Sequence, residues 1–187
     1  MVINLNTKVR KIAFSGAIAA LYIAITLAIM PLSFGPVQIR FSEVLTILPF
    51  FFPASIWGIF IGCIIANLFS PYGLIDIVVG PTASLIAAIC TCYLGMSRGR
   101  DSVFIKALAC FPPVIFNAIF IGAMIAYFIV GDLSSNLFIN TFIIYGLWVG
   151  LGQLIVLYLI GFPLMIYLPT TRAMDRLYYL YSGGDTK

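Results

Sequence analysis

Long apolar runs, separated by short polar or proline- and glycine-containing breaks, occupy most of this chain. A helix that crosses a bilayer needs about 20 mostly apolar residues. Only 9% of the residues are charged, whereas a soluble domain carries roughly a quarter. The sequence therefore predicts an all-α membrane protein, a six-transmembrane-helix bundle that forms a single integral membrane domain over residues 1–187. The predicted spans cover residues 12–31, 41–52, 54–69, 74–96, 103–130 and 138–168.

The second and third spans depend on dividing one apolar stretch, residues 41–69. As a single helix it would be about 43 Å long, too long for a core of about 30 Å without strong tilt. Pro49 and Pro53 favour a break, because proline interrupts helical hydrogen bonding. With six spans and the N- and C-termini cytoplasmic, nine of the ten basic residues lie inside, as the positive-inside rule requires. These nine are Lys8, Arg10, Lys11, Arg98, Arg100, Lys106, Arg172, Arg176 and Lys187.

The tenth basic residue, Arg40, lies in the segment Ser33–Val44, three residues before Glu43. Charged groups near the hydrocarbon region are costly, so they are kept with a partner, a water-filled cavity or a ligand. Residues three apart share a face of a helix, so Arg40 and Glu43 either neutralise each other or serve a bound molecule. The two interpretations are compatible, and both stay open.

Further polar side chains fall in the outer half of the predicted bundle, which is typical of a site that captures a polar molecule from outside. The predicted substrate-binding residues are Glu43, Arg40, Asp76, Gln38, Asn67, Trp148, Tyr145 and Asn117. Structural alternatives exist for most of them. The two asparagines could form interhelical hydrogen bonds, the two aromatic residues could face lipid, and the aspartate suits a first helical turn.

The first apolar run carries small residues every four positions, at Gly16, Ala20, Ala24 and Ala28. Such spacing allows helices to approach closely in a membrane. This stripe either packs inside the bundle or forms a docking face for another protein.

The chain lacks the residues that several other classes of function require. The chain has no histidine, the usual proton shuttle and the commonest metal ligand. Its four cysteines lie in apolar runs and are interpreted as packing residues. No nucleophile–base pair stands out, and no phosphate-binding Gly-x-x-x-x-Gly-Lys-Ser/Thr loop is present. We therefore expect no enzyme, no catalytic residue, no metal, no cofactor and no nucleic-acid partner.

Five short segments carry a resemblance to a known family, and this resemblance is dense over about residues 12–95. They are Ala20-Leu-Tyr-Ile-Ala24, Pro31-Leu-Ser-Phe-Gly-Pro-Val-Gln-Ile-Arg-Phe-Ser-Glu43, Leu48-Pro-Phe-Phe-Phe-Pro53, Gly62-Cys-Ile-Ile-Ala-Asn67, and Gly73-Leu-Ile-Asp76 with Gly80. Together they resemble the QueT family, and Gly-Pro-x-Gln-x-Arg-x-Ser-Glu is the most specific part. After residue 95 the resemblance is looser.

The resemblance implies a substrate-binding (S) component of an energy-coupling factor (ECF) transporter, which imports queuosine precursors across the bacterial plasma membrane. It implies that the small-residue face of the first helix docks a transmembrane coupling subunit, which carries two cytoplasmic ATPase subunits. The ligand would be a 7-deazaguanine, with or without an aminomethyl arm. Glu43 or Asp76 would accept hydrogen bonds from its ring edge, Arg40 or Gln38 would donate to its carbonyl, and Trp148 or Tyr145 would stack on it.

Other functions remain open at this point. The chain could be an S component for another vitamin or aromatic small molecule, or a solitary carrier driven by an ion gradient. A membrane enzyme and a purely structural subunit are weaker alternatives, because the first lacks catalytic groups and the second leaves the clustering of polar groups unexplained.

Overall fold

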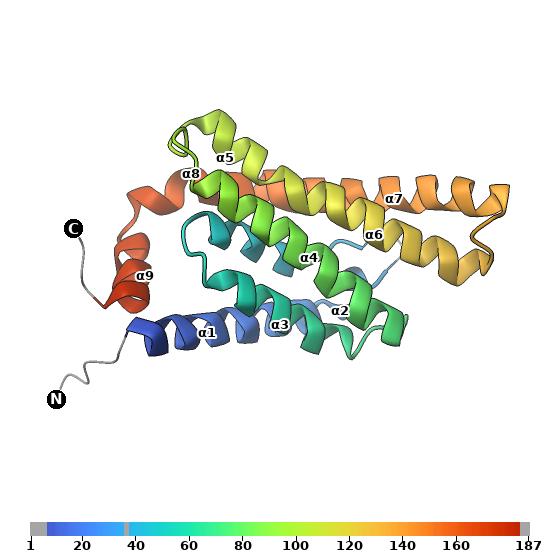
Figure 1. Cartoon of the computed structure of the whole chain (residues 1–187), viewed down its shortest axis with the longest axis horizontal. Coiled ribbons are helices and arrows are strands. Elements are labelled where there is room, and N and C mark those ends of the chain that lie inside the picture. The colour runs from blue at the N-terminus through green and yellow to red at the C-terminus, as the bar shows by residue number, and fades with distance from the viewer. Residues whose placement is uncertain (1–6, 36–37, 184–187) are drawn as a thin grey trace.

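A computed structural model describes residues 7–35 and 38–183, and within these residues all regular secondary structure is helical (Figure 1). The prediction of an all-α fold is confirmed. Residues 36–37 of the Ser33–Val44 segment and Lys187 lie outside the described residues. The helices are α1 (Thr7–Ala28), α2 (Met30–Ser33), η1 (Phe41–Phe50), α3 (Ser55–Asn67), α4 (Leu74–Gly95), α5 (Val103–Ala109), α6 (Phe111–Val130), α7 (Asn136–Val156), η2 (Leu157–Gly161), α8 (Phe162–Tyr167), η3 (Leu168–Thr170) and α9 (Arg172–Ser182).

Four helical stretches in the described part of the chain are long and apolar enough to cross a membrane: Thr7–Ala28, Leu74–Gly95, Val103–Val130 and Asn136–Thr170. The protein is therefore a multi-pass membrane protein. The two remaining predicted spans correspond to η1 and α3, which are apolar but shorter. Each is about 20 Å long, because η1 is a 3₁₀ helix that rises about 2.0 Å per residue, and α3 has 13 residues at about 1.5 Å. The count of six spans stays a prediction.

Prolines divide the longer helical stretches. The break between η1 and α3 falls at residues 51–54, beside Pro53. Pro112 and Pro113 start α6 after the short α5, and Pro163 follows the π-helical turn η2. The absent N–H of Pro163 and the clash of its ring with the carbonyl four residues earlier account for the widened turn.

The helices pack in sequence order, α1 against α3, α3 against α4, α4 against α6, and α6 against α7. The short η1 lies inside this arrangement and contacts α1, α3, α4 and α7 (Figure 1). A 3₁₀ run of ten residues is unusual, since most are three or four residues long. Its Ser42, Glu43 and Thr46 side chains are fully buried, so this helix places polar groups in the centre of the bundle.

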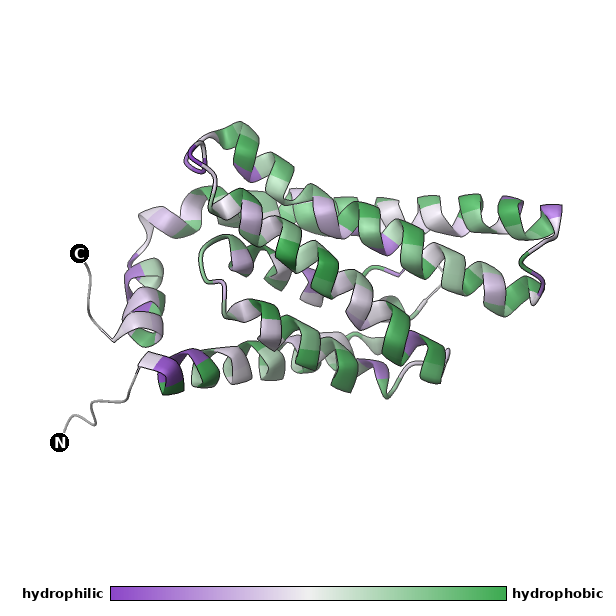
Figure 2. Cartoon of the chain, in the orientation of Figure 1, coloured by the Kyte–Doolittle hydropathy of each residue, from purple (hydrophilic) through white to green (hydrophobic). Residues whose placement is uncertain are grey.

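One end of the bundle gathers the start of α1, the loop between α4 and α5, and the amphipathic α9, and it carries many hydrophilic residues (Figure 2). Aromatic rings tie α9 to this end: the Phe52 ring lies 5.0 Å from that of Tyr178 and 5.3 Å from that of Tyr181. Both described chain termini lie at this same end (Figure 1). The cytoplasmic location of the termini stays a prediction.

Candidate functional site

Glu43 of η1 is the centre of a buried polar network. Its Oε1 atom accepts hydrogen bonds from the hydroxyl of Tyr22 on α1 at 2.6 Å and from that of Ser84 on α4 at 3.0 Å. The carboxylate, the phenol and the Ser84 side chain are all fully buried. The Oε2 atom has no hydrogen-bond partner. Oε1 is thus held in place by two hydroxyl groups, whereas Oε2 can still accept a hydrogen bond. Because a buried polar atom without a partner is costly, a further donor at Oε2 would be stabilising.

Arg40 lies just before η1 and is also buried. Its Nη1 points to the Sγ atom of Cys63 at 3.7 Å, and the Phe34 ring centroid lies 5.1 Å from its Cζ. Its Nε and Nη2 atoms have no partner. Sulfur is a weak acceptor, so this guanidinium makes no strong hydrogen bond to the described residues.

The structure does not pair Arg40 with Glu43: no salt bridge joins these two described residues. The reason lies in the backbone, because Arg40 has an extended conformation (φ −101°, ψ 97°) and precedes the helix rather than belonging to it. The three-residue spacing therefore does not place the two side chains on one helical face.

Asp76 lies in the first turn of α4, and both of its oxygens are occupied. Oδ1 accepts from the Asn67 side-chain nitrogen at 3.2 Å, and Oδ2 accepts from the Ser70 hydroxyl at 2.5 Å. The same Asn67 nitrogen donates to the Asp76 backbone carbonyl at 2.8 Å. A Cβ atom on Gly80 would collide with this Asn67 nitrogen, so glycine is needed for the amide to approach α4. We refer to Asn67, Ser70 and Asp76 as the Asp76 clasp.

Tyr72, in the loop before α4, lies beside the clasp. Burial, and then the negative charge of Asp76, raise the pKa of its phenol. Gln38 is buried with its Nε2 unpartnered, and its φ of 44° is the left-handed conformation that few non-glycine residues adopt. Glu43, Arg40, Gln38, Asn67 and Asp76 are thus all buried in or beside η1, α3 and the start of α4.

The other three predicted residues lie on α6 and α7. Asn117 of α6 is buried with its Nδ2 unpartnered. Tyr145 is half-buried and packs with Tyr72 against an apolar cluster around Ile121. The Trp148 side chain is 49% exposed on the outside of α7.

Sequence reasoning did not select Tyr22, Ser84 or Cys63 as site residues, although all three contact Glu43 or Arg40. A signal exists for two of them. Tyr22 is two positions from Ala20 and so projects opposite the small-residue stripe, and Ser84 follows Asp76 and Gly80 at four-residue spacing on one face of a helix.

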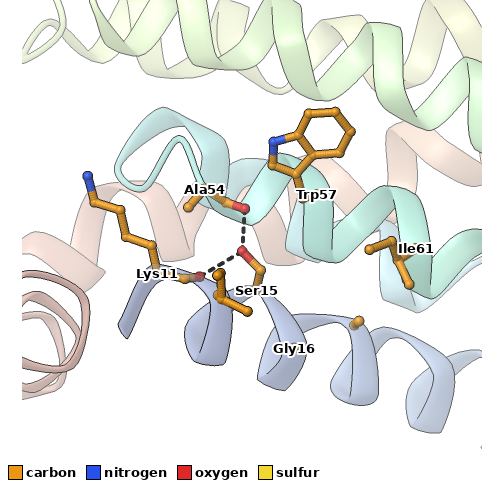
Figure 3. A pocket seen from close by; sticks show the side chains of 8 residues that line it. Lys11, Ser15, Gly16, Ala54, Trp57 and Ile61 are labelled. Carbon is orange, nitrogen blue, oxygen red and sulfur yellow. Dashed lines mark hydrogen bonds between the residues drawn. The ribbon is translucent and has the colours of Figure 1, made fainter. Parts of the chain in front are cut away.

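The small-residue stripe of the first helix faces outward: Gly16, Ala20, Ala24 and Ala28 are all exposed. Beside it, α1 and α3 form an apolar groove of about 370 Å³ (Figure 3). Ser15 of α1, which lines the groove, donates a hydrogen bond to the Ala54 carbonyl at 2.6 Å, and Trp57 of α3 also lines the groove (Figure 3). Within the described chain, α1 packs on α3 through the glycines of α3, Gly58 and Gly62, not through its own stripe.

The chemistry available at the buried centre is recognition by hydrogen bonding and charge. No group of three or more histidine, cysteine, aspartate or glutamate side chains that could hold a metal ion occurs among the described residues. The fold and this site define a multi-pass, all-helical membrane protein with a buried polar centre.

The chain belongs to the QueT transporter family, whose model matches residues 12–170. A relative from Lactococcus lactis subsp. cremoris (strain MG1363), the queuosine precursor transporter QueT, is 34% identical over 83 residues. The match covers 43% of this chain and 48% of the relative, so it spans about half of that relative's length. No solved structure matches the chain. Because the family is one of transporters, the prediction that the chain is not an enzyme is confirmed, and so is its resemblance to QueT.

Proposed function

We propose that this chain is the substrate-capturing S component of an ATP-driven ECF importer in a bacterial plasma membrane, and that it takes up a queuosine precursor of the 7-deazaguanine class. Membership of the QueT transporter family supports the substrate class. The chain binds the precursor from outside and delivers it to the cytoplasm with a coupling subunit and two ATPase subunits.

The observation that carries this proposal is the pair of buried charges with unused hydrogen-bonding atoms. Glu43 offers Oε2 as an acceptor, and Arg40 offers Nε and Nη2 as donors. A 7-deazaguanine presents adjacent N–H donors beside a carbonyl acceptor, which is the complementary pattern. A site of this kind rejects compounds that lack the matching groups, because its buried partners would then remain unpaired.

The two carboxylates have different roles in this proposal. Glu43 binds the ring edge of the precursor, whereas Asp76, which accepts from the Asn67 amide on one oxygen and from the Ser70 hydroxyl on the other, holds the loop before α4 in place. Arg40 and Gln38 donate to the ring carbonyl, and Asn117 and Tyr145 approach the ligand from the α6–α7 side. Trp148 stacks on the ligand only if α7 turns, since its side chain is half exposed.

Calorimetric titration of the purified protein with 7-aminomethyl-7-deazaguanine tests the substrate class, with adenine, riboflavin and tryptophan as competitors of other classes. We expect saturable binding of the deazaguanine and none of the others. Binding of another vitamin or aromatic compound in its place would contradict the assignment.

The docking role of α1 requires a separate experiment. The stripe Gly16, Ala20, Ala24 and Ala28 is exposed and lies beside an apolar groove, which suits close approach of a partner helix. We expect Ala24→Trp to leave ligand binding unchanged and to abolish ATP-dependent uptake into proteoliposomes. The matched control is Leu147→Trp on the exposed side of α7. Uptake that persists in Ala24→Trp, or that requires an ion gradient and no ATPase, would contradict the importer assignment.

A further inference from the structure

The α1 helix has two faces with different neighbours. Ala20 and Ala24 are exposed on its outer face, on the same stripe as Gly16, which lines the groove of Figure 3. Tyr22 and Thr26 are fully buried on its inner face. Because these two residues are four apart, they lie one turn from each other on the same side of the helix. The helix therefore separates the outer groove from the buried polar centre.

Two hydrogen bonds connect the inner face of α1 to neighbouring residues of η1. The Tyr22 hydroxyl donates to Glu43 Oε1 at 2.6 Å, and the Thr26 hydroxyl donates to Ser42 Oγ at 2.7 Å. The bond to Glu43 has the short length of a hydroxyl bound to a carboxylate, which is among the stronger hydrogen bonds in proteins. Both bonds are fully buried, where the low dielectric strengthens them.

The direction of the Tyr22 side chain is fixed by close packing of α1 on α3. A Cβ atom on Gly62 would lie 2.9 Å from Tyr22 Cβ and 3.0 Å from the Ala19 carbonyl oxygen. The backbones of the two helices are therefore nearly in contact at this point. A shift or rotation of α1 would carry the Tyr22 hydroxyl with it, and with that hydroxyl the Glu43 carboxylate.

We infer that Tyr22 is a positioning residue: it holds Oε1 of Glu43 so that Oε2 is presented to the substrate, and it makes α1 the element through which the outer groove and the substrate site affect each other. The inference rests on the proposed function, because it takes Glu43 as the ligand-binding carboxylate. It goes beyond it by assigning a role to a residue of α1 that acts through Glu43.

A double-mutant cycle on binding of 7-aminomethyl-7-deazaguanine tests the positioning role. We expect Tyr22→Phe to weaken binding by roughly 10- to 100-fold, the range for loss of a hydrogen bond to a charged group. In a Glu43→Gln background, the same change is expected to weaken the residual binding less than twofold. The matched control is Tyr158→Phe, whose hydroxyl donates to the Ala107 carbonyl at 3.0 Å away from Glu43, and it should bind as the unmutated protein does.

A fluorescent label on Ala24→Cys tests the connection to the outer face. Cys90 is the one partly exposed cysteine of the four, so it is replaced by serine in this background. Saturating ligand is expected to change the emission of the label, and Tyr22→Phe at saturating ligand is expected to remove that change. The same label on Phe104→Cys, exposed on α5, should not respond to ligand.

The outcomes separate the inference from the proposed function. If Glu43→Gln binds the deazaguanine as tightly as the unmutated protein, the proposed site is wrong. If Glu43→Gln weakens binding and Tyr22→Phe has no effect, or an equal effect in both backgrounds, the site stands and the positioning role is wrong. An Ala24 label that ignores ligand, or that responds equally without the Tyr22 hydroxyl, overturns the connection through α1.

Discussion

Glu43 and Asp76 are the two buried carboxylates in the described part of the chain, and their surroundings differ. Two hydroxyl donors meet at one oxygen of Glu43, from helices distant in sequence, and leave the second oxygen without a partner. Asp76 has a donor on each oxygen, and both donors come from within ten residues along the chain. A buried carboxylate with an unused oxygen, such as Glu43, can bind a ligand, whereas one with a donor on each oxygen, such as Asp76, stabilises the fold.

Glu43→Gln gives the largest expected effect on binding. Tyr22 and Ser84 can still donate to the remaining carbonyl oxygen, so the fold is retained, but the position of Oε2 can carry an NH₂ group that faces the ligand donors. We expect affinity for the deazaguanine to fall by about 100-fold or more, since a buried bond to a charged partner is lost and a donor is left opposing a donor. Calorimetry measures the affinity. Circular dichroism confirms the fold, and unchanged affinity would remove the contrast with Asp76.

Asp76→Asn is expected to have the opposite profile. An amide at this position cannot accept on both atoms, so either Asn67 or Ser70 loses its acceptor in a buried site. We expect a loss of stability of about 1–3 kcal/mol, measured as a lower unfolding temperature in detergent. The dissociation constant of the deazaguanine should change only a few-fold. A large loss of affinity with full stability would place Asp76 in the binding site instead.

Gly80→Ala tests the clasp without changing a charge. The added methyl group would collide with the Asn67 nitrogen, and overpacking of this kind costs about 1–3 kcal/mol. We expect a stability loss that is not additive with that of Asp76→Asn, because both changes break the same contact. Gly99→Ala is the matched control, since a Cβ atom there meets its nearest neighbour at an ordinary 3.5 Å. Additive losses would mean that the two residues act separately.

Asp132, in the loop between α6 and α7, gives the smallest expected effect and extends the comparison to an exposed carboxylate. Hydrogen bonds from the Ser134 backbone N–H and hydroxyl lower the pKa of Asp132. Because its pKa is lower in the folded protein, the stabilisation is present above the ordinary aspartate pKa and is lost as the pH falls through the folded value. We expect Ser134→Ala to raise the pKa of Asp132, as measured by NMR titration. A pKa unaffected by this change would show that the hydroxyl does not contribute.

Much of the architecture could be predicted from the sequence, because long apolar runs with prolines at their ends constrain a chain strongly. The helical fold, the break near Pro53 and the existence of a small-residue stripe on α1 are all visible as patterns of residue type, whereas the sequence leaves open whether that stripe faces outward. The 3₁₀ geometry of η1 could not be predicted. Its apolar sequence fits an α-helix equally well, and only the packing of four neighbouring helices around it distinguishes the two.

The site could be predicted only in part. Arg40, Glu43, Asn67 and Asp76 could be selected from the sequence because charged and amide side chains are costly, and therefore rare, in an apolar chain. The partners of Glu43 and Arg40 are Tyr22, Ser84 and Cys63, ordinary constituents of membrane helices whose roles depend on tertiary contacts. The Arg40–Glu43 ion pair, one of two interpretations of the spacing, is absent from these described residues because Arg40 lies in extended backbone.

The most direct test of the account is mass spectrometry of the small molecule that remains bound to the protein after purification from bacteria. The unmutated protein, Glu43→Gln and Asp76→Asn would be compared at equal protein recovery. We expect a 7-deazaguanine on the unmutated protein and on Asp76→Asn, and none on Glu43→Gln. Equal amounts on all three proteins, or loss from Asp76→Asn alone, would contradict it.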